Sequence, residues 1–318
     1  MRHDFVQQTL REMERNKNIV FLTGDLGFRA LEPIQTRFPD RFHNVGIAEA
    51  NMIGMAAGLA LMGKKVIAYS ISTFLTMRPY EQIRTDICYD NLDVKLFGTG
   101  GGFNYPTHGI THHSVEDIAI MSVLPNMKVV CPAYSWEARE ATRALLRNSG
   151  PSYMRLSKAP SSTYEKKDWQ FEIGKGYAVR PGTDVVLIST GNILDMVMET
   201  AKLLEQKIKK KIGVISMPTV KPLDEELVLK LAKKARAIFT IEEHSIIGGL
   251  GSAIGMVLAQ SGARTVFRAF GIPDRYIKDV GDRKYLLTKC GLSPELLVSQ
   301  IFQTIKHSRV SGKAFFKI

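Results

Sequence analysis

VGIAEANMIGMAAGLALMGKKVIAYSI, residues 45–71, joins two patterns that together decide the fold. Residues 48–63 are small and apolar with one charge near the start, a composition that predicts a buried helix. Residues 64–72 are β-branched and apolar over a short length and end in serine, which predicts a buried strand. A buried helix that leads directly into a buried strand is the repeating unit of an α/β protein.

The same alternation extends in both directions along the first half of the chain. Strands are predicted at 18–25, 64–72, 93–100, 127–133 and 151–157, and helical patterns at 48–63, 78–91, 115–126 and 135–149. Strands that alternate with helices form a mainly parallel sheet with helices on both faces. The first half is therefore predicted to be one α/β domain.

The pattern stops in a polar, turn-rich stretch and then restarts. Strands are predicted at 184–190, 211–217, 236–244 and 265–272, with helices at 192–206, 224–234 and 252–260. A chain of 318 residues is also long enough for two domains. We therefore predict an α/β domain at 1–165, a linker at 166–183 and a second, smaller α/β domain at 184–318.

The composition is that of an ordinary globular protein, with 45% hydrophobic and 23% charged residues. Three widely separated cysteines form neither a disulfide framework nor a metal cluster, which favours a reducing cytoplasm. The first 18 residues lack the apolar core of a signal peptide. The apolar run at 52–62 is shorter than the about 18 residues that a membrane helix needs.

The formal net charge of +12 permits anionic partners, namely nucleic acid, a phosphorylated substrate or an acidic subunit. The basic residues gather in segments such as KLLEQKIKKK (202–211) without interleaved aromatic residues. This arrangement favours solvated helix faces over a nucleic-acid surface.

Glu49 is the single charge in the apolar stretch, and no basic residue lies within several positions of it. A buried carboxylate without a partner is unfavourable, so it either keeps its proton or finds a complementary group. One interpretation is a first-turn acid that favours the helix dipole. The other is a buried acid that shares a proton with a nitrogen of a ligand.

Two further segments contain candidate site residues. In STFLTMRPYEQIR (72–84), Phe74, Met77 and Tyr80 share one helical face, which is either core or the wall of a site for a flat ring. GTGGGFNYPTHGITHHSVEDIAIM (98–121) places three glycines before three histidines, which indicates a loop that a ligand or another backbone approaches closely. Because no cysteine is nearby and the spacing is wrong, a zinc site is not predicted.

EEHSIIGGLGSAIG (242–255) follows a predicted strand and contains Gly249 and Gly251. The next glycine, Gly255, comes one position too late for a G-x-G-x-x-G dinucleotide loop, and no acid follows on a strand about 20 residues later. A dinucleotide site is therefore not predicted.

Taken in order, DRFHNVGIAEANMIGMAAGLALMGKK (40–65), the segments at 72–102 and 107–133, and IEEHSIIGGLGSAIG (241–255) resemble the pyrimidine-binding and C-terminal domains of transketolase. The resemblance covers residues 21–271 and is strongest to the C-terminal half-subunits of split transketolases. It implies thiamine diphosphate as cofactor, with Glu49 donating a proton to N1′ of the aminopyrimidine. Phe74 then corresponds to the aromatic residue that stacks on the pyrimidine, Asp25 to an acid close to the cofactor, and Ile47 and Arg78 to further cofactor-binding positions.

The resemblance also implies a substrate-binding set. His112 matches the family histidine that contacts the substrate oxygens and helps proton transfer, so Glu49 and His112 are the predicted catalytic residues. Lys158 stands where the family has an arginine that binds the substrate phosphate. His108, His113 and Arg155 complete the predicted set.

Some positions depart from the family pattern. His108 stands where the family has an aspartate that contacts a donor hydroxyl, Gly100 where it has a second histidine, and Ala50 where it has a glutamine. The residues that activate the cofactor are thus kept while the sugar pocket is changed. This difference favours an unusual ketose or a branched-sugar pathway over the standard pentose-phosphate reaction.

The G-D-G…N motif, which binds Mg²⁺ and the diphosphate in the family, is absent from the sequence. We therefore expect a separate α subunit to hold the diphosphate and the metal, no metal ligand in this chain, and a two-plus-two assembly. An acidic α chain would be attracted by the positive charge of this one. The expected activity is two-carbon ketol transfer between a ketose and an aldose. The alternatives are a partner that decarboxylates a 2-oxo acid, as in deoxyxylulose-phosphate synthase or 2-oxo acid dehydrogenase β subunits, and a non-catalytic assembly subunit.

Overall fold

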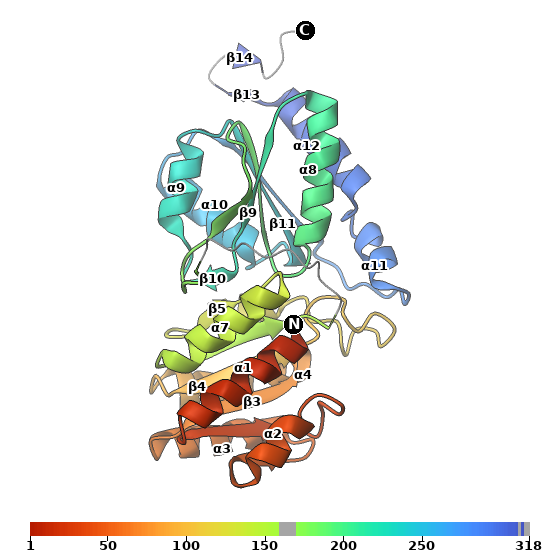
Figure 1. Cartoon of the computed structure of the whole chain (residues 1–318). Coiled ribbons are helices and arrows are strands. Elements are labelled where there is room, and N and C mark those ends of the chain that lie inside the picture. The colour runs from red at the N-terminus through yellow and green to blue at the C-terminus, as the bar shows by residue number, and fades with distance from the viewer. Residues whose placement is uncertain (159–169, 311–312, 315–318) are drawn as a thin grey trace.

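Two sheets, each covered by helices on both faces, form two domains stacked end to end, with the second domain above the first in Figure 1. This computed structural model describes residues 1–158, 170–310 and 313–314. Two α/β domains with mainly parallel sheets were predicted from the sequence, and this fold class is confirmed.

The first sheet has seven strands in the order β10-β5-β6-β4-β3-β1-β2. Its strands are β1 (Ile19–Thr23), β2 (Phe42–Asn44), β3 (Lys65–Ile71), β4 (Val94–Thr99), β5 (Lys128–Val130), β6 (Ser152–Leu156) and β10 (Thr219–Lys221). All neighbours pair in parallel except β10, which pairs antiparallel with β5. The carboxyl ends of the parallel strands therefore meet at one edge, where ligands bind in α/β sheets.

The strands of this sheet alternate their side chains between two helical layers. On β3, Ile67 and Tyr69 pack in a core with α1 and α7, whereas Val66 and Ala68 pack in a core with α3, α4, η2 and α6. The helices of the domain are α1 (Arg2–Arg15), α2 (Glu32–Arg37), η1 (Pro39–Arg41), α3 (Glu49–Leu61), α4 (Ser72–Met77), α5 (Tyr80–Gln82), the π-helical η2 (Ile83–Cys88), α6 (Asp117–Ser122) and α7 (Ser135–Arg147).

The second sheet has five strands in the order β12-β11-β8-β9-β7. Its strands are β7 (Tyr177–Arg180), β8 (Val185–Thr190), β9 (Ile212–Ser216), β11 (Ala237–Ser245) and β12 (Val266–Ile272). Helices α8 (Leu194–Ile208) and α12 (Pro294–His307) pack on one face, and α9 (Glu225–Ala232) and α10 (Leu250–Gln260) on the other (Figure 1). Helix α11 (Arg283–Lys289) precedes α12, and β13 (Arg309–Val310) pairs with β14 (Lys313–Ala314).

Two short strands change the predicted division of the chain. The boundary predicted between residues 165 and 166 lies outside the described residues. Strand β7 falls inside the predicted linker at 166–183 and pairs with β9, so the described part of that range contains regular structure. Strand β10, within the second domain's sequence, completes the first sheet. Both are edge strands of three or four residues with little apolar pattern, which is why the sequence did not reveal them.

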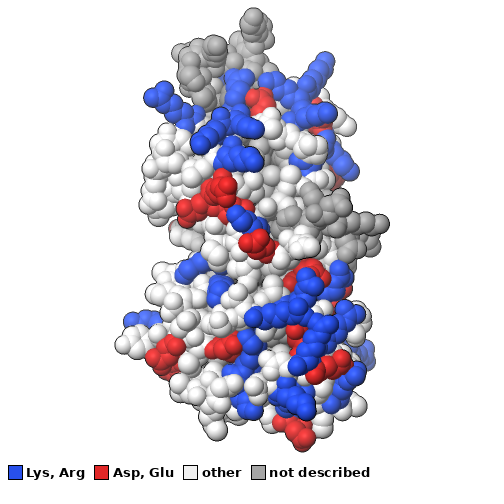
Figure 2. Space-filling model, turned by 60° about the vertical axis from the view of Figure 1, so that its left-hand side comes forward, with Lys and Arg blue, Asp and Glu red and all other residues white. Residues whose placement is uncertain are grey.

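Many of the basic side chains on the surface of the first domain lie beside acidic side chains (Figure 2). Figure 2 shows Lys and Arg side chains gathered over the first domain, with Asp and Glu between them. Arg147 and Arg15 both lie near Glu12, at 2.9 and 3.7 Å, and Arg37 lies 2.7 Å from Glu14. These pairs are typical of a solvated helical surface. Among the described residues, no helix is long and apolar enough to cross a membrane.

Candidate active site at the carboxyl edge of the first sheet

Glu49 begins α3 and is only 3% exposed. It lies beside the end of β1, since a Cβ added to Gly24 would be 3.9 Å from Glu49 Oε1. The sequence places no basic residue near Glu49 and suggested a ligand as its complement, but the fold brings a basic residue of this chain to it. Arg78, which follows α4, donates from Nη1 to Glu49 Oε2 at 2.9 Å.

Arg78 also covers the ring of Phe74. The guanidinium carbon of Arg78 lies 3.8 Å from the centroid of the Phe74 ring. The Phe74 ring also packs against His112 in a T-shaped arrangement, with ring centroids 5.0 Å apart and an angle of 68° between the ring planes. Three segments of the sequence therefore come together here, and they contribute Glu49, the pair Phe74 and Arg78, and His112.

The histidine loop between β4 and α6 is fixed to α4. Thr73 Oγ1 of α4 donates to the carbonyl of Thr111 at 3.1 Å. Thr111 Oγ1 in turn shares a 2.9 Å hydrogen bond with Nδ1 of His112. The ring centroids of His112 and His108 lie 4.8 Å apart, and the ring centroid of Tyr105 lies 5.6 Å from each of them.

Partial burial lowers the pKa of His112, and the nearby charges of His108, Arg78 and His113 lower it further. The imidazole therefore stays neutral at neutral pH, so it can accept a proton or a hydrogen bond from a substrate hydroxyl.

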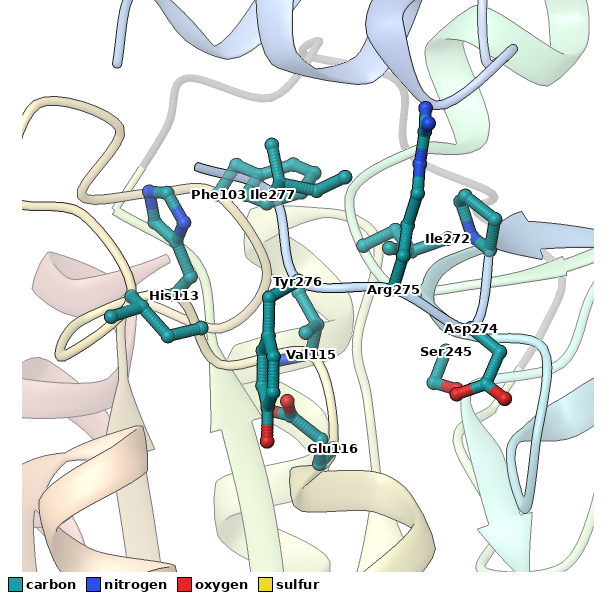
Figure 3. Close-up of a pocket in the computed structure, with 12 residues that line it drawn as sticks. Phe103, His113, Val115, Glu116, Ser245, Ile272, Asp274, Arg275, Tyr276 and Ile277 are labelled. Carbon is teal, nitrogen blue, oxygen red and sulfur yellow. The ribbon is translucent and has the colours of Figure 1, made fainter. Parts of the chain in front are cut away.

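His113 lines a cavity whose lining includes neither His108 nor His112. It lines a pocket of about 370 Å³ between the two domains, together with Phe103, Glu116 and Tyr276. Figure 3 shows Tyr276 extending toward Glu116, with His113 beyond it on the side of the first domain. Burial lowers the pKa of His113, and its Nε2 lies 3.4 Å from the carbonyl of Pro106. The structure thus separates His113 from the other two histidines.

Arg155 is buried in a network that joins the domains. Its Nη2 donates to the carbonyls of Ser114 and Glu243, at 2.5 and 3.0 Å, and its Nε lies 3.2 Å from Asp117 Oδ2. The guanidinium is thus engaged by the protein, and the prediction that Arg155 contacts substrate finds no support in this arrangement.

Lys158 lies at a cationic pocket of about 360 Å³. Arg2, His3, Arg29 and Lys158 line it at the start of α1. Lys158 Nζ lies 4.6 Å from the centroid of the Tyr105 ring. Burial raises the pKa of Tyr105, and the positive charge of Arg2 partly offsets this rise. Through Tyr105 the pocket therefore adjoins the histidine loop, and it suits an anionic group.

Asp25 and Ile47, the remaining predicted cofactor-binding residues, lie at the exposed edge of the candidate site. Asp25 is exposed, has a φ of 53°, and accepts from Nδ2 of Asn44 at 2.8 Å. Ile47 is 74% exposed. The sequence analysis did not single out Arg2, Arg29 or Tyr105. Arg2 looks like any arginine of an amphipathic helix, and only the folded chain brings it to Lys158.

Comparison with known proteins identifies both domains. Residues 2–161 match the transketolase pyrimidine-binding domain, and residues 174–296 match the transketolase C-terminal domain. The chain belongs to the transketolase family. The resemblance stated from the sequence motifs is thereby confirmed.

Some of the relatives that match this chain along most of their own length are described as transketolase subunits. An apulose-4-phosphate transketolase subunit of Actinobacillus succinogenes is 34% identical over 84% of this chain and 86% of its own length. The 6-deoxy-6-sulfo-D-fructose transketolase subunit SqwH of Clostridium sp. strain MSTE9 is 36% identical over 94% and 92%. A solved split-gene transketolase, described as an inactive β4 tetramer, has a TM-score of 0.86 at 34% identity and covers 97% and 98%.

Proposed function

We propose that this chain is the β subunit of a two-chain, thiamine-diphosphate-dependent transketolase that moves a two-carbon ketol unit from a ketose to an aldose. The observation that carries the proposal is the meeting of Glu49, Phe74 and His112 at the carboxyl edge of the first sheet, beside a cationic pocket. This combination offers a buried acid, an aromatic face and a neutral imidazole.

The site fits the pyrimidine end of the cofactor. A planar cation of the chain itself already bonds to Glu49 and stacks on Phe74, so the space between the two suits a flat group with N–H donors. When bound, thiamine diphosphate supplies a nucleophilic carbon and an electron sink for the two-carbon fragment. Glu49 would hold a proton at the pyrimidine, Phe74 would orient the ring, and Ile47 and Asp25 would lie near it.

His112 and the cationic pocket provide the substrate side of the proposal. His112 would exchange a proton with a sugar hydroxyl, and His108 would contact the same sugar. Arg2, Arg29 and Lys158 would bind an anionic terminal group, such as a phosphate or sulfonate. Two of the relatives act, by their names, on sugars of this kind, which supports an unusual or branched anionic sugar as substrate.

The partner in this proposal is a diphosphate-binding α subunit. Among the described residues, no group of three or more His, Cys, Asp or Glu side chains could hold a metal ion. We therefore assign Mg²⁺ and the diphosphate to the partner. Phe28, Ile47, Met77 and Ile110 are exposed apolar side chains near the candidate site, as expected for a surface that a second chain covers.

The test is co-purification with the neighbouring chain, followed by a ketose panel with thiamine diphosphate and Mg²⁺. Ketol transfer from an anionic ketose supports the proposal. Arg29→Ala and Lys158→Ala should raise KM for the anionic sugar with little change in kcat, whereas Lys17→Ala on the exposed surface should change neither. Release of CO₂ from pyruvate without ketol transfer would instead identify the decarboxylating alternative.

A further inference from the structure

Arg78 fills the space between two side chains that the proposed function assigns to the cofactor. Its guanidinium carbon lies over the Phe74 ring, 3.8 Å from the centroid, and its Nη1 donates to Glu49 Oε2 at 2.9 Å. One planar group therefore uses the aromatic face and the buried carboxylate at the same time.

A guanidinium and an aminopyrimidine can bind to the same kinds of side chain. Both are planar and delocalised, both present N–H donors in their plane when protonated, and both stack on aromatic rings. They compete for Glu49 Oε2 and for the face of Phe74 that Arg78 covers. The Phe74 ring also packs against His112 in a T-shaped arrangement, so a ligand that stacks on Phe74 in place of Arg78 would lie close to His112.

Arg78 is placed so that it can leave. Its side chain is 46% exposed, whereas that of Glu49 is 3% exposed. In the part of the chain that the structure describes, the ion pair of Arg78 is with Glu49 alone. Because Arg78 follows the last residue of α4, its side chain can turn toward solvent without unwinding that helix.

We infer that Arg78 is an internal latch, which occupies the pyrimidine subsite of the cofactor-free chain and gives it up when the cofactor arrives. The inference rests on the proposed function and goes beyond it. A buried carboxylate without a partner is destabilising, so the latch keeps the empty site folded. The same contact reduces the fraction of chains that are ready to bind and so weakens the apparent affinity by that fraction.

The experiment uses the complex of this chain with its diphosphate-binding partner, freed of cofactor. Arg78→Ala removes the latch, and we expect thiamine diphosphate with Mg²⁺ to associate about tenfold faster and bind correspondingly more tightly. Arg78→Lys keeps the charge but not the planar group. Its association rate and affinity should lie between those of Arg78→Ala and those of the unaltered complex. Arg84→Ala is the matched control, because Arg84 is an exposed arginine of the same segment that pairs with Glu81.

Calorimetry gives the affinity and stopped-flow fluorescence the association rate, so no measurement of turnover is needed. A second readout is thermal unfolding, in which the apo complex of Arg78→Ala should melt lower and gain more from cofactor than the unaltered complex. Weaker or unchanged binding in Arg78→Ala would overturn the inference and leave the proposed function standing, with weaker binding marking Arg78 as a cofactor contact. A complex that binds no cofactor in any variant would overturn both.

Discussion

Glu49 is deeply buried and pairs with Arg78. Replacing its carboxylate with an amide of the same shape is therefore a sharp test of its catalytic role. Glu49→Gln keeps the shape of the side chain and an oxygen that accepts from Arg78, but it removes the exchangeable proton. We expect the fold and the melting temperature to be nearly unchanged and ketol transfer to fall by at least about 100-fold, the usual contribution of a general acid.

The matched control for this prediction is Glu81→Gln, an exposed glutamate of the neighbouring segment. Circular dichroism checks the fold, and a coupled assay with the partner chain follows the transfer. Full turnover in Glu49→Gln would reject the catalytic role of Glu49, whereas a loss of folding would show that the side chain is needed for structure.

His112 provides a second prediction for a single residue, based on its charge. Burial and then the neighbouring His108 lower the pKa of His112, so the ring keeps its neutral form further into the acid range than an ordinary histidine. His108→Asn removes one of these positive neighbours and should raise the pKa of His112. The acidic limb of the activity profile would then move to higher pH, because protonation begins earlier as the pH falls.

An NMR titration of the His112 ring measures this shift directly and independently of turnover. His307→Asn in α12 serves as the control, because that histidine is exposed on the second domain. A pKa of His112 that stays constant or falls in His108→Asn would show that the two rings do not interact as their 4.8 Å separation indicates.

The residues differ in how much the sequence could say about them. Glu49, Phe74 and His112 lie in motifs, so the resemblance named them, and the structure brings them together. The sequence does not show that two adjacent histidines in a loop point their side chains in different directions. His113 was therefore grouped with His112, although only His113 lines the pocket between the two domains. The pairing of Arg78 with Glu49, 29 positions apart, depends on the turn of the chain through β3 and α4.

At the scale of elements, the loop from β4 to α6 is held by the second domain. Glu243 of β11 accepts from the backbone N–H of Phe103 at 2.8 Å, and Arg283 of α11 donates to both oxygens of the Glu243 carboxylate. The loop that carries His112 is therefore anchored from β11. The C-terminal domain thereby helps to position the candidate site of the first domain.

Gly102→Ala tests this anchoring. Gly102 has a φ of 64°, and a Cβ there would come within 2.5 Å of the Glu243 side chain. We expect the variant to lose about 1–3 kcal/mol of unfolding free energy from backbone strain alone. The clash with Glu243 should add to this loss and lower kcat.

Gly109→Ala is the control for Gly102→Ala, since Gly109 has a similar φ of 69° but nothing within 4 Å of an added Cβ. Chemical denaturation of both variants separates the clash from the strain. Equal losses in the two variants would mean that the contact with Glu243 does not constrain the loop.

Elements with long, periodic patterns were predictable and short ones were not. Helix α8 and strand β3 were located within two residues at each end, because the apolar residues of α8 repeat with the helical period and β3 is a continuous apolar run. Helix α3 was predicted to be buried on all sides, but Gly54, Met55, Gly58 and Leu61 are exposed. A helix that is apolar all round is usually buried on all sides, but the described residues of this chain leave one side of α3 exposed.

At the scale of the whole molecule, this exposed face of α3 points to assembly. Met55 and Leu61 of α3 and Met62, which follows the helix, are 40%, 69% and 81% exposed, and Glu49 lies at the other end of the same helix. Contiguous exposed apolar side chains mark an interaction surface in proteins of this kind. A partner chain that covered α3 along its length would reach the start of the helix and hence the proposed cofactor site, as a site shared between two chains requires.

We therefore predict that Leu61→Lys combined with Met62→Lys weakens association with the partner chain at least about tenfold, because two charges would have to be desolvated in an apolar contact. The isolated chain should keep its melting temperature, since exposed substitutions rarely change stability by more than about 0.5 kcal/mol. Val123→Lys, which charges an equally exposed apolar residue beside α6, is the control and should leave association intact. Sedimentation velocity on mixtures of the two chains measures the complex. An unchanged association in the double variant would mean that the partner binds elsewhere, and the location of the shared site beside α3 would then have to be abandoned.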